Sequence, residues 1–205
     1  FDDRGNFVRE IGQNVYGLGY GHSLRFDNDD NLWVVDKGTN AVTKFNPSGY
    51  VVLNLGRRPE GFDDFEHRPA SDPRTQDGYF QGPTDVGWDA DGNIYVSDGY
   101  INSRVGKMDK WGNWITSWGS FGREQGQFRT PHNLQVDRQG MGYVADRNNN
   151  RIQKYVGDGN LVKSIRLNVP YAKTRHPVLG NLPANPQNRS DNTQPWTLCI
   201  SAGET

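Results

Sequence analysis

The sequence has little of the material that disulfide frameworks, cysteine-based zinc sites and membrane spans require. It contains one cysteine, Cys199, among 205 residues, which excludes an internal disulfide and any Cys-rich zinc motif. Cys199 lies in the apolar run Trp-Thr-Leu-Cys-Ile, which predicts a buried thiol acting as a small hydrophobic side chain. The apolar runs are too short to cross a bilayer, so we expect no membrane partner.

An excess of either charge is also missing. Lys and Arg total 23 against 24 for Asp and Glu, a formal net charge of −1, and neither sign forms a long run. Proteins that bind nucleic acid present a basic face, so we expect no nucleic-acid partner. The chain opens at Phe1 without a Met, so a removed leader cannot be tested. The compartment is left open, and a secreted or periplasmic location is compatible with the sequence.

What the sequence does contain is a repeated β unit. A short apolar run, an Asp-rich turn ending in Gly or Asn, a second apolar run and a closing Asp occur three times, at residues 22–36, 84–98 and 132–146. The 25 Gly and 11 Pro suit many short strands joined by tight turns. Repeats about 40 to 60 residues apart with such turn signals indicate the blades of a propeller.

Each unit predicts four strands. Apolar residues alternate on both sides of the turn, as in Leu24 and Phe26, which is typical of a half-buried hairpin. A third run follows at 41–45, 104–108 and 151–155, then a second turn and a fourth run. The predicted fold class is therefore all-β: a β-propeller of four-stranded antiparallel blades, three full and two partial, forming part of a six-bladed ring.

One propeller domain is expected over residues 1–205. It comprises the end of a blade at 1–20 with a fourth strand over 6–11, blades at 21–56, 82–119 and 130–166, an inserted loop at 57–81, a long loop at 171–192, and the start of a further blade at 193–205. Propellers use about four to eight blades, so three do not close a ring. Either the partial blades combine into a fourth, or this is a piece of a longer chain, which we favour.

The repeat places polar residues at one end of the axis. In a hairpin the start of the first strand is level with the end of the second, so His22 should neighbour Asp36, and His132 should neighbour Asp146 and Arg147. First strands line the axial channel, so both histidines should point towards its mouth. Two imidazoles there are a candidate site for zinc or a similar ion. Alternatively, they only cap the strand starts.

Longer strings around these positions resemble a known family. They read Gly-Pro-Thr-Asp-Val at 82–86, Ile-Tyr-Val-Ser-Asp-Gly-Tyr-Ile-Asn-Ser-Arg at 94–104, Gly-Gln-Phe-Arg-Thr-Pro-His-Asn-Leu at 126–134 and Val-Ala-Asp-Arg-Asn-Asn-Asn-Arg-Ile-Gln at 144–153. Over roughly residues 20–157 the chain resembles NHL-repeat propellers, and within them the peptidyl-α-hydroxyglycine α-amidating lyases.

The resemblance implies roles for four residues. His22 and His132 would be zinc ligands, Tyr100 the catalytic tyrosine, and Arg147 a conformational or substrate-positioning arginine. Zinc would be the cofactor, with calcium as a structural ion. The implied chemistry is cleavage of a carbinolamide into amide and aldehyde, with zinc polarising a hydroxyl and a tyrosinate acting as base. From the residues alone, Tyr100 is equally a packed loop aromatic, and Arg147 an ion-pair partner of Asp98 or Asp146.

The sequence also departs from the family pattern. The family's third zinc histidine follows a proline, whereas here the matching strand carries Pro195 and Trp196. His67 and His176 do not stand in the sequence context of that third ligand and are interpreted as solvated loop histidines. The third ligand is thus missing, and the family's upstream arginine would fall before Phe1.

Two functions stay open. The first is a metal-dependent lyase, or a relative of one, acting on a small-molecule or peptide ligand at the channel mouth. The second is a non-catalytic propeller that binds a protein or ligand on its rim through the loop aromatics Trp111, Trp114, Trp118 and Tyr79. A calcium-dependent sugar-lactone hydrolase ranks last, because no matching acidic set is present.

Overall fold

The computed structural model describes residues 1–15, 17–58, 77–167 and 194–200. Within them twelve strands form three four-stranded antiparallel sheets, which confirms the predicted blades. The strands are β1 (Gly21–Phe26), β2 (Leu32–Asp36), β3 (Ala41–Phe45), β4 (Val51–Gly56), β5 (Asp85–Trp88), β6 (Ile94–Asp98), β7 (Arg104–Met108), β8 (Trp114–Trp118), β9 (Pro131–Val136), β10 (Gly142–Asp146), β11 (Arg151–Tyr155) and β12 (Leu161–Arg166). A 3₁₀ helix, η2 (Arg147–Asn149), follows β10. No helix among the described residues has the length and apolarity to span a bilayer.

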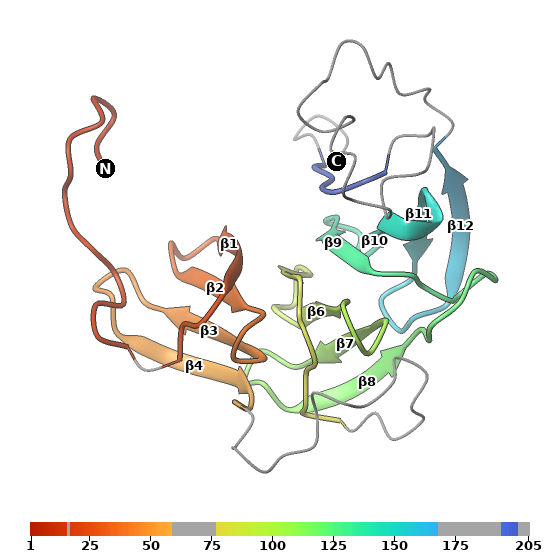
Figure 1. Ribbon diagram of the computed structural model, residues 1–205, viewed down its shortest axis with the longest axis horizontal. Helices are drawn as coiled ribbons and strands as arrows, with labels where there is room; N and C mark the ends of the chain where they lie inside the picture. The colour runs from red at the N-terminus through yellow and green to blue at the C-terminus, as the bar shows by residue number, and fades with distance from the viewer. Residues whose placement is uncertain (16, 59–76, 168–193, 201–205) are drawn as a thin grey trace, which may run out of the picture.

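The three blades stand side by side in an arc (Figure 1). In each blade the strands follow chain order, with the first strand on the inner side of the arc and the fourth on the outer side. The first strands β1, β5 and β9 therefore line the axis, as the repeat predicted, with β5 between the other two. Residues at the same repeat position consequently meet at the same end of the axis.

The core lies between the blades. One cluster joins the first blade to the second and includes Trp33, Val35, Val96 and Met108. A second joins the second blade to the third and includes Tyr95, Val105, Leu134 and Tyr155. Strand β6 supplies both clusters, since Ile94 and Val96 face one neighbour while Tyr95 faces the other. Period-two alternation thus buries both faces of the middle blade.

An aspartate fixes the turn between the first two strands of each blade. Asp27 accepts hydrogen bonds from the backbone N–H groups of Asp29 and Asn31, both at 3.0 Å, and from Trp33 Nε1 at 2.9 Å. Asp89 and Asp137 repeat the arrangement, with the hydroxyls of Tyr95 and Tyr143 replacing the indole. Such Asx turns favour a tight hairpin and hold the strand ends level.

The aspartate that closes each second strand anchors a loop instead. Asp36, Asp98 and Asp146 are buried and accept hydrogen bonds from the backbone of the incoming segment, at Gly19, Gln81 and Arg129 respectively. Burial raises the pKa of Asp98 and of Asp146 despite the arginines beside them. These carboxylates are committed to the fold and are not available as ligands at the axis.

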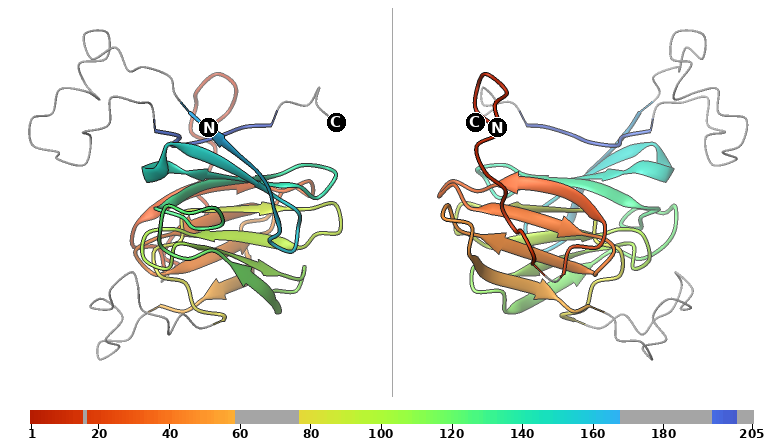
Figure 2. Two further views of the ribbon diagram at one scale, coloured as in Figure 1. Left: turned by 90° about the vertical axis from the view of Figure 1, so that its right-hand side faces the viewer. Right: turned by 60° about the vertical axis from the view of Figure 1, so that its left-hand side comes forward.

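The ends of the chain differ from the predicted partial blades. Asp2 closes a turn onto Asn6 as Asp109 does onto Asn113, but no strand forms over 6–11, and residues 1–10 are exposed (Figure 2). Residues 194–200 likewise form no strand. A β-strand forms when its backbone hydrogen-bonds to a neighbouring strand, and neither segment has such a neighbour among the described residues. Cys199 is consequently exposed, so the prediction of a buried thiol is wrong.

The two expected loops fall mostly outside the described residues. The part of the insert at 59–76, with His67, and residues 168–193, with His176, are not among them.

Candidate metal and catalytic site

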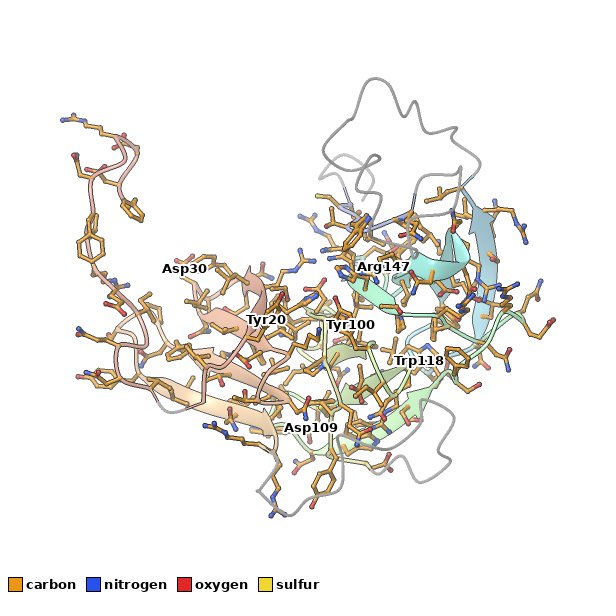
Figure 3. All side chains as sticks on the ribbon, in the orientation of Figure 1. Tyr20, Asp30, Tyr100, Asp109, Trp118 and Arg147 are labelled. Atoms are coloured by element: carbon orange, nitrogen blue, oxygen red, sulfur yellow. The ribbon has the colours of Figure 1, made fainter. Side chains whose placement is uncertain are left out.

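The structure brings all four candidate residues together at the end of the axis where the first strands begin, here called the near mouth. His22 lies on β1, His132 on β9, Tyr100 just after β6, and Arg147 just after β10. Figure 3 shows Tyr100 on the inner side of the arc, between Tyr20 of the first blade and Arg147 of the third. Their convergence follows from the repeat, since each occupies a strand start or strand end at one rim.

Both histidines are the extra residue of a β-bulge. The pairing of β1 with β2 passes from Gly21 opposite Asp36 directly to Ser23, and that of β9 with β10 passes from Pro131 opposite Asp146 directly to Asn133. Asp36 and Asp146 therefore pair with Gly21 and Pro131, the residues directly before the histidines. A bulge leaves its extra residue unpaired and redirects its side chain, which here aims both imidazoles at the axis.

The two imidazoles face one hydroxyl. Tyr100 Oη lies 3.3 Å from His22 Nε2 and 3.4 Å from His132 Nε2, and the two imidazole centroids are 4.8 Å apart. The other ring nitrogens meet backbone carbonyls, His22 Nδ1 at 2.7 Å from Thr84 O and His132 Nδ1 at 2.8 Å from Trp196 O. A carbonyl only accepts, so the proton is assigned to Nδ1 in both rings and both Nε2 lone pairs face Tyr100.

The local environment keeps both imidazoles neutral. Burial lowers the pKa of His132 to about 4, and the nearby Arg147 and His22 add to that effect. Burial likewise lowers the pKa of His22, with a contribution from Lys37. At neutral pH two unprotonated Nε2 atoms therefore share the single proton of one hydroxyl. Imidazoles held by carbonyls at Nδ1 with Nε2 free are typical of metal ligands.

Two cations frame Tyr100. Lys37 Nζ lies 3.8 Å from the centroid of the Tyr100 ring, and the Arg147 guanidinium carbon lies 5.8 Å from that centroid and 4.3 Å from the centroid of Trp196. Neither cation forms an ion pair within the described part of the chain. The site thus gathers positive charge beside two neutral imidazoles.

The alternative ion-pair interpretation of Arg147 is wrong. Asp146 pairs with Arg151 at 2.7 Å, and Asp98 pairs with Arg104 at 3.2 Å. Both carboxylates are therefore occupied by the arginine that begins the third strand of their own blade.

Sequence reasoning missed Lys37 and the part played by Trp196. Lys37 follows the closing Asp36 as Arg147 follows Asp146, so its repeat position was a signal that it would reach the same rim. Trp196 was noted only as the residue that replaces a histidine, whereas its carbonyl orients His132. A backbone contact across 64 residues leaves no trace in the sequence pattern.

A buried carboxylate fixes the strands that carry the histidines. Asp85 on β5 is fully buried and accepts from Arg25 of β1 at 2.6 Å and from Asn133 of β9 at 2.6 Å. It also accepts from the backbone of Leu134 at 3.0 Å. The positions of His22 and His132 relative to one another therefore depend on this contact. No group of three or more His, Cys, Asp or Glu able to hold a metal occurs among the described residues.

The three blades arranged around one axis identify the fold class of the protein as a β-propeller. A streptogramin B lyase structure superposes with a TM-score of 0.52 at 16% identity, covering 75% of this chain and 42% of that one. A structure of the RRP9 WD40 repeats superposes with a TM-score of 0.50 at 12% identity, covering 72% and 38%. Similarity at this level of identity shows the fold alone.

The sequence comparisons narrow the class. Peptidyl-glycine alpha-amidating monooxygenase A of Xenopus laevis is 38% identical over 167 residues, covering 78% of this chain. The probable peptidyl-alpha-hydroxyglycine alpha-amidating lyase pgal-1 of Caenorhabditis elegans is 33% identical, covering 64%, and NHL repeat-containing protein 3 of Mus musculus is 26% identical, covering 63%. The chain is an NHL-repeat β-propeller that resembles the amidating lyases. It spans 16%, 35% and 36% of the lengths of these three relatives, and no protein-family model matches it.

Proposed function

We propose that the near mouth binds a divalent metal ion, zinc, and that the site cleaves the C–N bond of a carbinolamide. The observation that carries the proposal is the pair of neutral Nε2 atoms, each with its Nδ1 held by a carbonyl, that share one tyrosine hydroxyl. Two half-buried acceptors share one donor here, so one of them lacks a hydrogen bond at any moment, and a cation would satisfy both nitrogens.

The type of ligand atom, neutral imidazole nitrogen, is suitable for zinc. Neutral imidazole nitrogen is a common zinc ligand, and carbonyls that orient the ligands are the usual outer partners. His22 Nε2 and His132 Nε2 would hold the ion. Catalytic zinc sites have about three protein ligands, so a further ligand would come from outside the described residues. When bound, zinc would polarise the hydroxyl of the substrate.

The chain's own residues would bind the substrate and move one proton. Cleavage of a carbinolamide breaks the C–N bond, forms a C=O bond, and transfers one proton from the carbinol oxygen to the amide nitrogen. Tyr100 Oη lies beside both imidazoles and, as the tyrosinate, would accept the proton from the carbinol oxygen and pass it to the amide nitrogen. Lys37 and Arg147, which lack ion-pair partners in the described segments, would attract a carboxylate end of a small-molecule or peptide ligand.

A second candidate function is binding of a protein or ligand on the rim without catalysis. Trp111 favours it, since 69% of this residue is exposed on the turn between β7 and β8. Trp114 and Trp118 do not contribute, because they pack against the two cores.

Elemental analysis of the chelator-washed protein after reloading with zinc tests the proposal. We expect about one zinc per chain in the wild type, loss of zinc in His22→Ala and in His132→Ala, and retention in Tyr100→Phe. The Tyr100→Phe variant should lose cleavage of an N-acyl-α-hydroxyglycine that the wild type supports. The same analysis would reveal the structural calcium that the resemblance implies. A protein that binds no metal would contradict the lyase proposal and leave the rim-binding propeller.

A further inference from the structure

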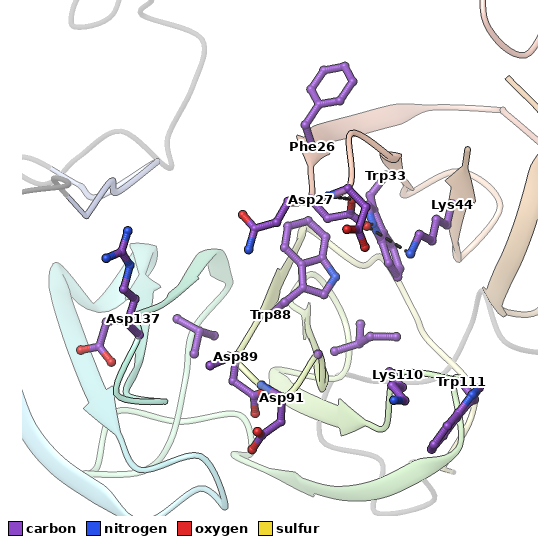
Figure 4. A pocket seen from close by; sticks show the side chains of 17 residues that line it. Phe26, Asp27, Trp33, Lys44, Trp88, Asp89, Asp91, Lys110, Trp111 and Asp137 are labelled. Atoms are coloured by element: carbon purple, nitrogen blue, oxygen red, sulfur yellow. Dashed lines mark hydrogen bonds and ion pairs between the residues drawn. The ribbon is translucent and has the colours of Figure 1, made fainter. Parts of the chain in front are cut away.

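A concave surface lies at the end of the axis opposite the near mouth and is here called the far mouth. It is a cleft of about 900 Å³ that extends over the three Asp-anchored turns and the β7–β8 turn (Figure 4). Phe26, Trp88 and Val136, the last residues of β1, β5 and β9, form its apolar part. Its volume is in the range of small-molecule sites in proteins.

Exposed aromatic rings line this cleft. Phe26 is 64% exposed and Trp111 is 69% exposed, and in Figure 4 Trp88 lies between them. Trp88 packs on Trp33 with ring centroids 5.2 Å apart, and this contact holds the Trp88 indole in position at the centre of the cleft. Flat apolar rings held open to solvent inside a concavity are a surface on which a ligand can stack.

The polar groups of the cleft divide into committed and free side chains. Asp27 and Asp89 are occupied by their own turns, as described above. The side chains of Asp29, Asp91 and Arg138, which also line the cleft, make no hydrogen bond or ion pair to any residue that the structure describes. The cleft thus offers both acceptors and a donor to a ligand.

The charges of the cleft disfavour an anion and disfavour a cation stacked on the aromatic rings. Lys44 Nζ already lies 5.0 Å from the centroid of Trp33, and Lys110 Nζ lies 4.6 Å from that of Trp111, so an external cation would meet a cation at either ring. An anion would meet the free carboxylates of Asp29 and Asp91.

We propose that the far mouth binds a neutral oligosaccharide. The C–H face of a sugar ring stacks on an indole or phenyl ring, and each sugar hydroxyl both donates and accepts, which matches a cleft lined by free carboxylates and a free guanidinium. This proposal does not depend on the metal site, which lies at the other end of the axis.

Isothermal titration calorimetry with cellotriose, chitotriose and maltotriose tests it. We expect saturable binding of at least one trisaccharide, about tenfold weaker in Trp111→Ala, where a stacking surface is lost, and weaker in Asp91→Ala. Tyr50→Ala is the matched control, because Tyr50 is equally exposed at 73% but does not line the cleft. His22→Ala should bind the sugar unchanged.

Three results would overturn the proposal. The first is the absence of saturable heat with all three sugars up to about 20 mM, a concentration well above the dissociation constants of specific sites. The second is equal affinity of Trp111→Ala and the wild type for the sugar. The third is displacement of the sugar by spermidine, which would identify a cation site instead.

Discussion

At the scale of single residues, the site depends on groups that support Tyr100 and the two histidines. The carbonyls of Thr84 and Trp196 assign the tautomers, and Lys37 and Arg147 lie near the tyrosine ring. Roles for these residues stay predictions until metal binding is measured. The position of Tyr100 itself depends on a glycine, because its backbone N–H donates to the carbonyl of Gly82 at 3.1 Å and its side chain packs directly over that residue.

Replacing Gly82 by Ala should displace Tyr100. Gly82 has φ +72°, and a Cβ added there would lie 2.7 Å from Tyr100 Cβ, a backbone-proximal atom that cannot move independently. Gly140→Ala is the matched control, since Gly140 has φ +77° and open space around it. Both variants bear the cost of positive φ, about 1 kcal/mol, and Gly82→Ala should lose about 1 to 3 kcal/mol more through the clash. Urea unfolding measures both. Equal losses would show that the tyrosine adjusts freely.

At the scale of the strand and the turn, the sequence predicted the hairpins but not the bulges or the conformation of the chain ends. Hairpins were predictable because period-two alternation and Asx turns are local signals, and the Asp27, Asp89 and Asp137 turns form where they were expected. The bulges that aim His22 and His132 carry no local signature, since a bulge is defined by the partner strand. The strand predicted over 6–11 does not form because propensity without a neighbour is insufficient.

The Asp27 turn should make stability depend on acid pH. Burial acts to raise the pKa of Asp27, but hydrogen bonds from Trp33, Asn31 and Lys44 outweigh it and lower the pKa from 3.8 to about 2. A pKa lowered by folding means that the ionised carboxylate stabilises the fold above about pH 4, and that this contribution disappears as the pH falls to about 2. The contribution should be about 1 to 2 kcal/mol.

Urea unfolding between pH 5 and pH 2 measures this effect, the interval being about that of the titration. Asp27→Asn should flatten the pH dependence by this amount. Asp29→Asn is the control, because the side chain of Asp29 makes no hydrogen bond within the described residues, and the substitution should change the free energy of unfolding by less than about 0.5 kcal/mol. Parallel profiles for the wild type and Asp27→Asn would show that the turn aspartate does not contribute.

At the scale of the whole molecule, the three blades are joined by two kinds of contact. Apolar clusters fill the two spaces between neighbouring blades, and the polar contacts of Asp85 connect all three inner strands. The near mouth and the far mouth lie at opposite ends of these strands. Among the residues that the structure describes, the near mouth has neutral imidazoles and two cations without an ion pair, and the far mouth has exposed rings and two carboxylates without a partner. A change at Asp85 should therefore affect the molecule as a whole.

Replacing Asp85 alone should lower the free energy of unfolding more than replacing both partners of its ion pair. Asp85→Leu leaves the Arg25 guanidinium and the Asn133 amide facing a buried apolar side chain, and should cost about 3 to 5 kcal/mol. In the double variant Arg25→Leu/Asp85→Leu the unpaired charge is gone, so the loss should be smaller than that of Asp85→Leu by about 1 to 3 kcal/mol. Urea unfolding of the wild type, both single variants and the double variant gives the coupling energy. Losses that simply add would mean that Asp85 and Arg25 stabilise the blades independently. A double-variant loss smaller than the sum of the two single losses, together with loss of zinc from Asp85→Leu, would link the cohesion of the blades to the geometry of His22 and His132.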